Sequence, residues 1–331
     1  MPGEYRDIEI LRQGEAATGH RIFGWVVLAA MTAFLINNVL EVGFGFPGLT
    51  EIFSGSAGAW VPALVYVALA ALAIANVLRT PSRTLRMDAQ SIHNFNIYLI
   101  RALFFAVFFV GIADAAIALL RTESLLEPLF GQDLARNLGR ANWVGPVVHM
   151  PLVVLGFIVA VFTRTLGFTW LALLIVVAEL LIVISRFVFS YEQALMADLV
   201  RYWYAALFLF ASAYTLFDEG HVRVDILYAS FTRRRKGTMN AIGTVLLGMA
   251  TCWVILAICF NGKQSIVNAP VMNFEVSQAG PFGMYAKYQM AAFIALFAVT
   301  MLIEFVSYYF EAVADHRDEP GHRNTESVSA H

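Results

Sequence analysis

The sequence predicts an all-α membrane protein with about eight transmembrane helices and with both termini in the cytoplasm. Of its 331 residues, 59% are hydrophobic and only 14% are charged. The mean hydropathy is +0.68, whereas a soluble domain is about 45–50% apolar and about 25% charged. The apolar residues also gather in eight runs that approach or exceed the roughly 20 residues needed to cross a bilayer.

The eight runs are expected to be helices, because they are continuous and lack the alternating pattern of a membrane β-barrel. The first is expected to be an uncleaved span, since the residues before it are partly acidic and unlike the basic start of a signal peptide. The fourth contains Pro146 and Pro151 near its start, which predict one kink. The seventh holds Cys252 and Cys259, about 10.5 Å apart along a helix and too far for a disulfide. The predicted limits are 22–42, 59–78, 97–120, 145–163, 167–189, 197–217, 239–260 and 284–310.

The orientation follows from the distribution of Lys and Arg. If the N-terminus is inside, the inner connections hold fourteen of these residues and the outer ones hold four. Positive charge collects on the cytoplasmic side of membrane proteins, so both termini are predicted to be cytoplasmic. The polar C-terminal segment 313–331 is expected to be a disordered tail.

Two connections mix apolar and charged residues. They are residues 79–96 and residues 122–140. Each is expected either to lie along the membrane surface as an amphipathic segment or to be an ordinary solvated loop.

Charged residues inside the predicted spans are candidates for function, because an ionisable group in a bilayer is costly. They are Asp114, Glu179, Arg186, Asp198, Arg201, Glu304 and Glu311. Arg186 ends the fifth span, while Asp198 and Arg201 begin the sixth, so we expect the three to form a charge network that pins this hairpin. The alternative is that each reaches the interface separately. Asp114 and His149 are expected to be hydrogen-bonded structural groups between helices.

Sequence motifs of enzymes do not occur. The chain has no Walker motif, GxGxxG, HExxH or CxxC. Of its seven histidines, His149 alone lies within a predicted span, which argues against a haem protein. The single basic run, residues 233–236, does not indicate nucleic-acid binding. We therefore expect no catalytic activity, no cofactor and no metal site.

Three motifs in the second half of the chain carry a family resemblance. They are Arg186-Phe187-Val188-Phe189, Asp198-Leu199-Val200-Arg201 and His221-Val222-Arg223-Val224-Asp225. With the four spans around them, they resemble the small membrane subunit, DctQ, of tripartite ATP-independent periplasmic (TRAP) transporters. The family more often has two glutamates where this chain has Ala197 and Asp198. The resemblance covers residues 165–312, so residues 1–164 look like the N-terminal extension of a longer subclass.

The resemblance implies a non-catalytic subunit in a bacterial inner membrane. Its partners would be a large membrane subunit, a periplasmic solute-binding protein and the lipid bilayer. It would brace the large subunit during sodium-driven uptake of an organic solute, usually a carboxylate. The alternatives are a stand-alone channel or carrier and an anchor for an unrelated membrane complex.

The third of these motifs lies in a short charged segment between two spans, residues 218–227. Its residues His221, Arg223 and Asp225 are expected to fix the path of the chain between the helices, or to contact the large subunit, or both. The basic run that follows is expected to meet anionic lipid headgroups.

Overall fold

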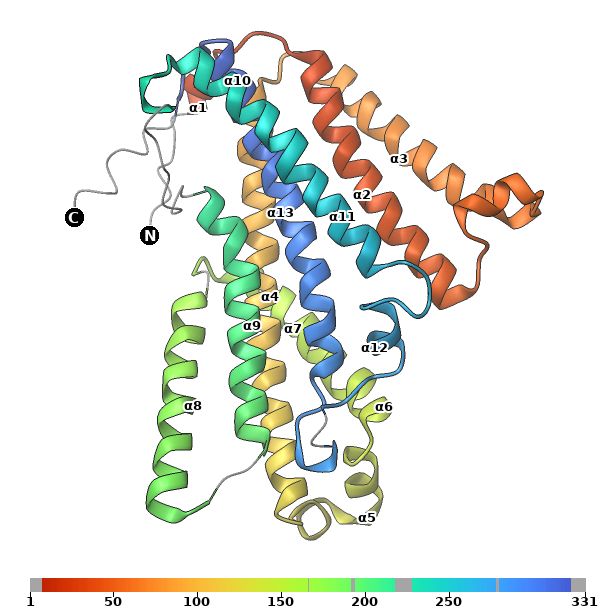
Figure 1. Ribbon diagram of the computed structural model, residues 1–331, viewed down its shortest axis with the longest axis vertical. Helices are drawn as coiled ribbons and strands as arrows, with labels where there is room; N and C mark the ends of the chain where they lie inside the picture. The colour runs from red at the N-terminus through yellow and green to blue at the C-terminus, as the bar shows by residue number, and fades with distance from the viewer. Residues whose placement is uncertain (1–7, 166, 192–193, 218–227, 278–279, 323–331) are drawn as a thin grey trace. The chain divides into compact units, whose positions relative to one another are not determined.

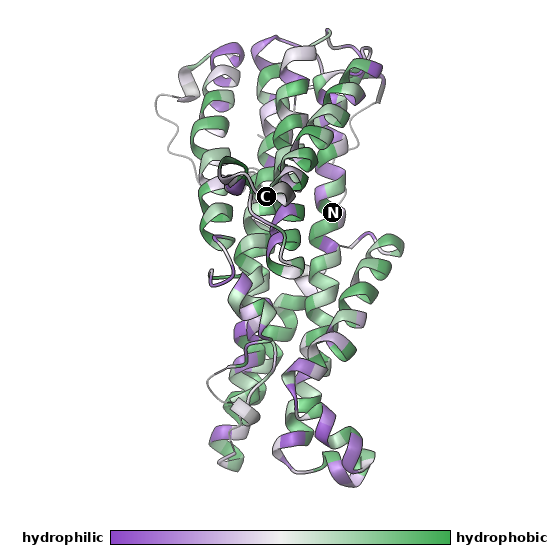
Figure 2. Cartoon of the chain, turned by 90° about the vertical axis from the view of Figure 1, so that its right-hand side faces the viewer, coloured by the Kyte–Doolittle hydropathy of each residue, from purple (hydrophilic) through white to green (hydrophobic). Residues whose placement is uncertain are grey.

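The computed structural model of the chain describes residues 8–165, 167–191, 194–217, 228–277 and 280–322 (Figure 1). Within these ranges the regular elements are all helices, and eight of them are long and apolar enough to cross a membrane. Figure 2 shows that hydrophobic residues cover most of the length of these helices. The prediction of an all-α chain with eight spans is therefore confirmed, while the side on which the termini lie stays a prediction.

Two of the eight candidate spans join several elements, because each contains a π-helical stretch. One joins α6, η3 and α7, where Pro151 lacks the N–H that a regular helix would bond to the carbonyl of Val147. The other joins α10, η5 and α11. The spans are α2 (Thr18–Phe44), α3 (Trp60–Arg79), α4 (Leu85–Thr122), α6 (Ala141–Val144) with η3 (Gly145–His149) and α7 (Met150–Phe162), α8 (Phe168–Phe189), α9 (Ala194–Phe217), α10 (Arg233–Gly243) with η5 (Thr244–Met249) and α11 (Ala250–Cys259), and α13 (Lys287–His316). The shorter α-helices are α1 (Ile8–Leu11), α5 (Leu126–Leu138) and α12 (Asn268–Met272).

Helix α4 begins much earlier than the sequence predicts. Residues 85–96, expected in a surface segment or loop, form its first three turns, and many of their side chains are buried. Thr84 caps the start of the helix, because its hydroxyl accepts the backbone N–H of Met87 at 3.2 Å. This expectation was wrong because the polar residues of the segment find partners inside the protein, as described below.

The described part of the segment predicted to be a disordered tail is folded. Residues 313–316 complete α13, and the carbonyls of Glu319 and Pro320 accept hydrogen bonds from Arg86. The order up to residue 322 therefore differs from the expectation, and residues 323–331 lie outside the described part of the chain.

The connection 122–140 contains α5, which has an apolar side and a polar side. Leu126 and Leu138 are buried in a small cluster with Val144 and Tyr285. Leu129 and Phe130 are exposed, next to a kink at Gly131, whose φ of 78° suits glycine. The position of this helix on a membrane surface stays a prediction.

The chain forms two compact units, and both contain residues from each half of the sequence. Unit 1 comprises Met1–Asn96, Thr215–Ala257 and Met301–His331. Unit 2 comprises Ile97–Tyr214 and Ile258–Thr300. The division predicted at residue 165 is a division of the sequence. The two compact units do not follow it, because each contains residues from before and after residue 165.

Small residues allow close helix contacts in unit 1. A methyl group at Gly24 in α2 would lie 2.4 Å from the ring of Phe310 in α13. One at Gly237 in α10 would lie 2.4 Å from the backbone nitrogen of His316. Helices α2 and α10 therefore both pack directly against the end of α13.

Unit 2 has the same type of contact between α4 and α7. A methyl group at Gly156 would lie 2.5 Å from the backbone nitrogen of Ala106 and 2.7 Å from its Cα. Glycine is therefore required for these two backbones to touch.

Replacing Gly156 by alanine is expected to separate α7 from α4 and to destabilise the protein by about 1–3 kcal/mol, because backbone atoms cannot move aside as a side chain can. The thermal unfolding of the detergent-solubilised protein measures this. Gly243→Ala is the control, since nothing lies within 4 Å of a methyl group there. Equal melting temperatures for the two variants would contradict the prediction.

Candidate functional site: a polar seam in unit 1

A row of polar side chains joins the first turns of α4 to the last turns of α13. On α4 the row contains Arg86, His93 and Asn96, and on α13 it contains Glu304, Ser307, Glu311 and Asp315. The spacings of three, four and seven residues keep each set on one face of its helix. We call this row the polar seam. It runs antiparallel, so the lowest number on α4 faces the highest numbers on α13.

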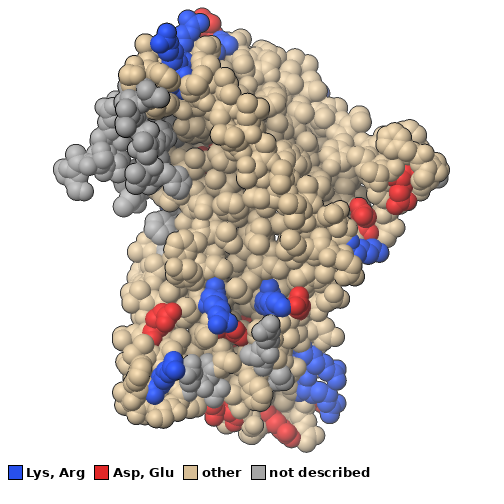
Figure 3. Space-filling model, in the orientation of Figure 1, with Lys and Arg blue, Asp and Glu red and all other residues tan. Residues whose placement is uncertain are grey.

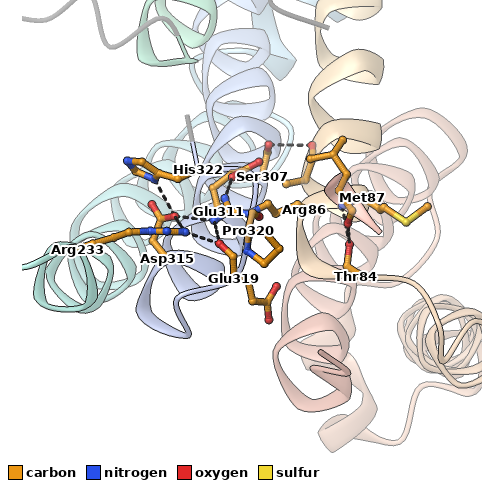
Figure 4. Close-up of polar contacts among 12 residues, drawn as sticks. Thr84, Arg86, Met87, Arg233, Ser307, Glu311, Asp315, Glu319, Pro320 and His322 are labelled. Atoms are coloured by element: carbon orange, nitrogen blue, oxygen red, sulfur yellow. Dashed lines mark hydrogen bonds and ion pairs between the residues drawn. The ribbon is translucent and has the colours of Figure 1, made fainter. Parts of the chain in front are cut away.

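Arg86 forms one end of the seam. Its side chain is 1% exposed and donates from all three guanidinium nitrogens (Figure 4). Nη1 donates to Glu311, Nη2 to Asp315 at 2.7 Å, and Nε to the carbonyl of Pro320 at 2.6 Å. Nη2 also lies 3.0 Å from the carbonyl of Glu319. This fork of donors binds two carboxylates and two carbonyls at once, which the single ammonium of lysine could not do in the same geometry.

Asp315 is shared between α4, α10 and the C-terminal segment. Its Oδ1 lies 3.4 Å from Nη2 of Arg233 and 2.9 Å from Nδ1 of His322, in addition to its contact with Arg86 (Figure 4). Arg233 also donates to the carbonyl of Glu319. At this end of the seam, two arginines face the two carboxylates of Glu311 and Asp315.

The carboxyl of Glu319 lies outside the spans, and its Oε1 is 2.8 Å from Nε of Arg317. Burial raises its pKa, and the nearby Arg317 and Arg86 oppose this effect. A group whose folded-state pKa is raised stabilises the fold when protonated. Its contribution is therefore present at low pH and is lost as the pH rises through the folded-state pKa.

The centre of the seam contains His93. Its Nδ1 lies 2.9 Å from Oε1 of Glu304, and Asn96 donates to the other carboxylate oxygen at 2.9 Å. The imidazole stacks on the ring of Phe217. Ser307 adds a hydrogen bond from its hydroxyl to the carbonyl of Ala89 at 2.9 Å. The Glu304 carboxylate is thus held by two donors from α4 in a buried position.

A second buried ion pair ties α2 to α4. Nε of Arg21 lies 2.7 Å from Oδ2 of Asp88, and both side chains are 1% exposed. Trp25 donates to the same oxygen at 3.0 Å, and Arg83 lies 2.6 Å from the other. Arg21 also donates to the carbonyl of Thr80 at 2.6 Å. The start of α4 is therefore fixed on two sides by charge-assisted hydrogen bonds.

These contacts favour a structural role over a chemical one. A buried ion pair contributes little net stability compared with apolar packing, but removing one partner is strongly destabilising. The seam therefore specifies how its segments pair.

Among the residues described, no group of three or more His, Cys, Asp and Glu side chains could hold a metal ion. On the face shown in Figure 3, most of the surface is uncharged, which contrasts with the charge gathered inside unit 1.

Unit 2 contains a separate buried polar network around Asp114 and His149. Oδ2 of Asp114 accepts the backbone N–H of Tyr285 at 2.6 Å, and its Oδ1 lies 3.4 Å from Nε2 of His149. Nδ1 of His149 lies 3.0 Å from the hydroxyl of Tyr288, which accepts from the amide of Gln289 at 3.0 Å. The structural hydrogen-bonding role expected for Asp114 and His149 is confirmed.

The direction of these bonds follows from the donors. The Tyr288 hydroxyl accepts from Gln289, so its own hydrogen is available to Nδ1 of His149. The imidazole proton then sits on Nε2, which lies 3.4 Å from Oδ1 of Asp114 without a hydrogen bond between them. Tyr202 extends the network, because its hydroxyl donates to the carbonyl oxygen of Gln289.

Asp198 and Arg201 lie on α9 beside a hollow of unit 2. Asp198 accepts from the hydroxyl of Ser277 at 2.9 Å and from the backbone N–H of Met284 at 3.0 Å. Arg201 is 4.0 Å from Asp198, and its side chain is 73% exposed. Both line a pocket of about 420 Å³ that also includes Lys287. An ion pair this exposed is weak, so Asp198 mainly holds the segment before α13.

The other predicted site residues lie at the end of α8 or outside the described part of the chain. Arg186 is exposed near the end of α8, and its joint role with Asp198 and Arg201 stays a prediction. His221, Arg223 and Asp225 lie outside the described residues. Cys252 and Cys259 are both free and buried, as expected.

Sequence reasoning missed the α4 side of the seam. His93 was placed in a connection, although the seven-residue spacing of Arg86 and His93 matches that of Glu304 and Glu311. That matched spacing, read on both helices together, was the available signal.

Comparison with known protein families finds a match for one part of the chain. Residues 173–311 match the family model described as "Tripartite ATP-independent periplasmic transporters, DctQ component". This segment is similar to the DctQ component. No curated protein and no solved structure matches the chain.

We call residues 173–311 the DctQ segment, and the family that it matches is a non-catalytic small membrane component of TRAP transporters. The chain is a multi-pass membrane protein. Its first helices form an extra N-terminal helical region outside residues 173–311, which match the family model. The polar seam crosses this boundary. Arg86 and His93 belong to the extra region, whereas Glu304 and Glu311 belong to the DctQ segment.

Proposed function

We propose that the chain is the small permease subunit of a sodium-driven TRAP transporter and braces the large membrane subunit of that complex. The match of residues 173–311 to the DctQ component carries this proposal. The cargo would be an organic solute, usually a carboxylate in this family, delivered by a periplasmic solute-binding protein. The complex would lie in a bacterial inner membrane.

The proposed orientation places both termini in the cytoplasm. Its support is the excess of Lys and Arg in the connections on that side. In this orientation the end of the seam formed by Arg86, Arg233 and Asp315 is at the cytoplasmic side. Arg186, Asp198 and Arg201 are at the periplasmic side.

The N-terminal extension, proposed to be residues 1–164, would act as an added part of the brace. The support comes from unit 1, where Arg86 and His93 of α4 are bound to Glu304 and Glu311 of the DctQ segment. A domain that moved independently would leave such charges without partners, at a high cost. We therefore propose that the extension and the DctQ segment move together during transport.

The test is co-purification followed by transport. The tagged chain is expressed with the large subunit and the binding protein, and the proteins retained in mild detergent are identified by mass spectrometry. We expect a stable complex with the large subunit, and solute uptake into liposomes only when all three proteins and a sodium gradient are present.

The control is the chain reconstituted alone. Uptake by this chain without the large subunit would overturn the proposal and favour the alternative of a stand-alone channel or carrier. Retention of an unrelated membrane complex in place of the large subunit would favour the anchor alternative.

A further inference from the structure

Helix α8 carries a carboxylate at the middle of a membrane span. Glu179 is close to the midpoint of Phe168–Phe189, so it lies about 15 Å from either end of the helix. Its side chain is exposed, and it forms no hydrogen bond or ion pair with another residue that the structure describes. In the described part of the chain, this differs from Asp114, Glu304 and Glu311, which are buried and bonded.

The helix around Glu179 is sparsely covered by the rest of the chain. In its most apolar stretch 11% of the residues are buried, compared with 56% for α13. Leu171 and Ile175 face the protein, and Ile175 is one turn from Glu179, whereas Val176 and Val183, also one turn away, are exposed. An exposed apolar surface that includes this one charge is therefore available for a partner.

Hydrocarbon cannot satisfy this carboxylate. Lipid tails offer no donor, and a glutamate side chain is too short to reach the headgroups from the middle of a span. Ionisable groups at this depth face a bundle interior or a partner that pairs with them. The partner must bring a cation or a strong hydrogen-bond donor.

We propose that α8 packs against the large membrane subunit through the surface around Glu179, and that this subunit places a Lys, an Arg or a neutral donor opposite the carboxylate. This rests on the proposed function and names the contact through which the brace acts. A second copy of the chain fits less well, because a two-fold contact centred on Glu179 would bring two carboxylates together.

The first test measures how much large subunit stays bound to tagged variants of the full chain. Glu179→Leu is expected to lower retention about tenfold, because the opposing donor loses its acceptor inside the membrane. Glu179→Gln, which keeps an acceptor, is expected to fall between this variant and the wild type. The control is Val177→Leu, on the far side of the same helix, which should retain the wild-type amount.

A second measurement separates partner contact from folding. The isolated Glu179→Leu chain should melt at or above the wild-type temperature, because it removes an exposed charge from an apolar surface. A lower melting temperature would assign Glu179 to the internal fold and overturn the inference.

A photocrosslinking amino acid at Val183 then identifies the neighbour. Cross-links to the large subunit are expected, and cross-links to lipid or to a second copy alone would overturn the inference. If the wild-type chain fails to retain the large subunit, the proposed function fails. If wild type and Glu179→Leu retain it equally, only this inference fails.

Discussion

Replacing Arg86 by methionine is expected to destabilise the protein by about 3–5 kcal/mol, the usual cost of removing one member of a buried ion pair. Methionine fills much of the same space but donates nothing to Glu311, Asp315 or the carbonyls of residues 319 and 320. Asp315 would keep its contacts with Arg233 and His322, whereas Glu311 would lose the bond from Nη1 of Arg86. Thermal unfolding of the detergent-solubilised protein measures the loss as a fall in melting temperature.

The matched control is Arg233→Met. Arg233 contacts the same Asp315, but its side chain is 35% exposed, so water can replace it. Its loss is expected to cost about 1 kcal/mol or less. Arg86→Lys should lie between the two, since it keeps the charge but not the fork of donors.

A double variant tests the mechanism of this loss. Adding Glu311→Leu to Arg86→Met removes one uncompensated carboxylate and should recover part of the stability. The ion-pair account would be refuted if Arg86→Met were no less stable than Arg233→Met, or if the double variant were worse than the sum of its parts.

The eight spans could be predicted from the sequence because they depend on a property that every residue in them shares. A run of about 20 apolar residues has few alternatives to a membrane helix. The predicted first residue of the second and fifth spans was within one residue of the helix start. These boundaries were clear because the composition changes abruptly there.

The seam could not be predicted in the same way, since it depends on which helices meet. Arg86, His93 and Asn96 have the composition of a loop, and they are buried only because α13 supplies matching partners. A single sequence gives the spacing of Glu304 and Glu311 but not the helix that faces them. The pairing is a tertiary property, so local polarity led to the wrong structure for residues 85–96.

The family resemblance rests on short motifs, yet these motifs explain little of the described structure. Asp198 of the second motif bonds Ser277 and the backbone of Met284, residues about 80 positions later in the chain. Nothing in the motif itself indicates these partners. The resemblance therefore predicted the family that the segment matches, but it did not predict the contacts of its residues.

Replacing Asp114 by leucine is expected to destabilise unit 2 by about 1–3 kcal/mol, because the N–H of Tyr285 would lose its acceptor in a buried site. Asp114→Asn should cost about 1 kcal/mol, since its carbonyl oxygen can still accept from Tyr285. Thermal unfolding in detergent measures both. Asp133→Asn on the exposed side of α5 is the control and should leave the melting temperature unchanged.

The asparagine variant also tests the direction of the hydrogen bonds. Its amide would bring N–H groups within about 3.4 Å of Nε2 of His149, so we expect the imidazole proton to move to Nδ1 and the Tyr288 hydroxyl to accept it. The ¹⁵N chemical shifts of labelled histidine should therefore show the tautomer change in Asp114→Asn and not in Asp133→Asn. An unchanged tautomer would mean that the Asp114 carboxylate does not fix the imidazole. The network would then be held from the Tyr288 side, and His149 would be expected to keep its orientation even in the leucine variant.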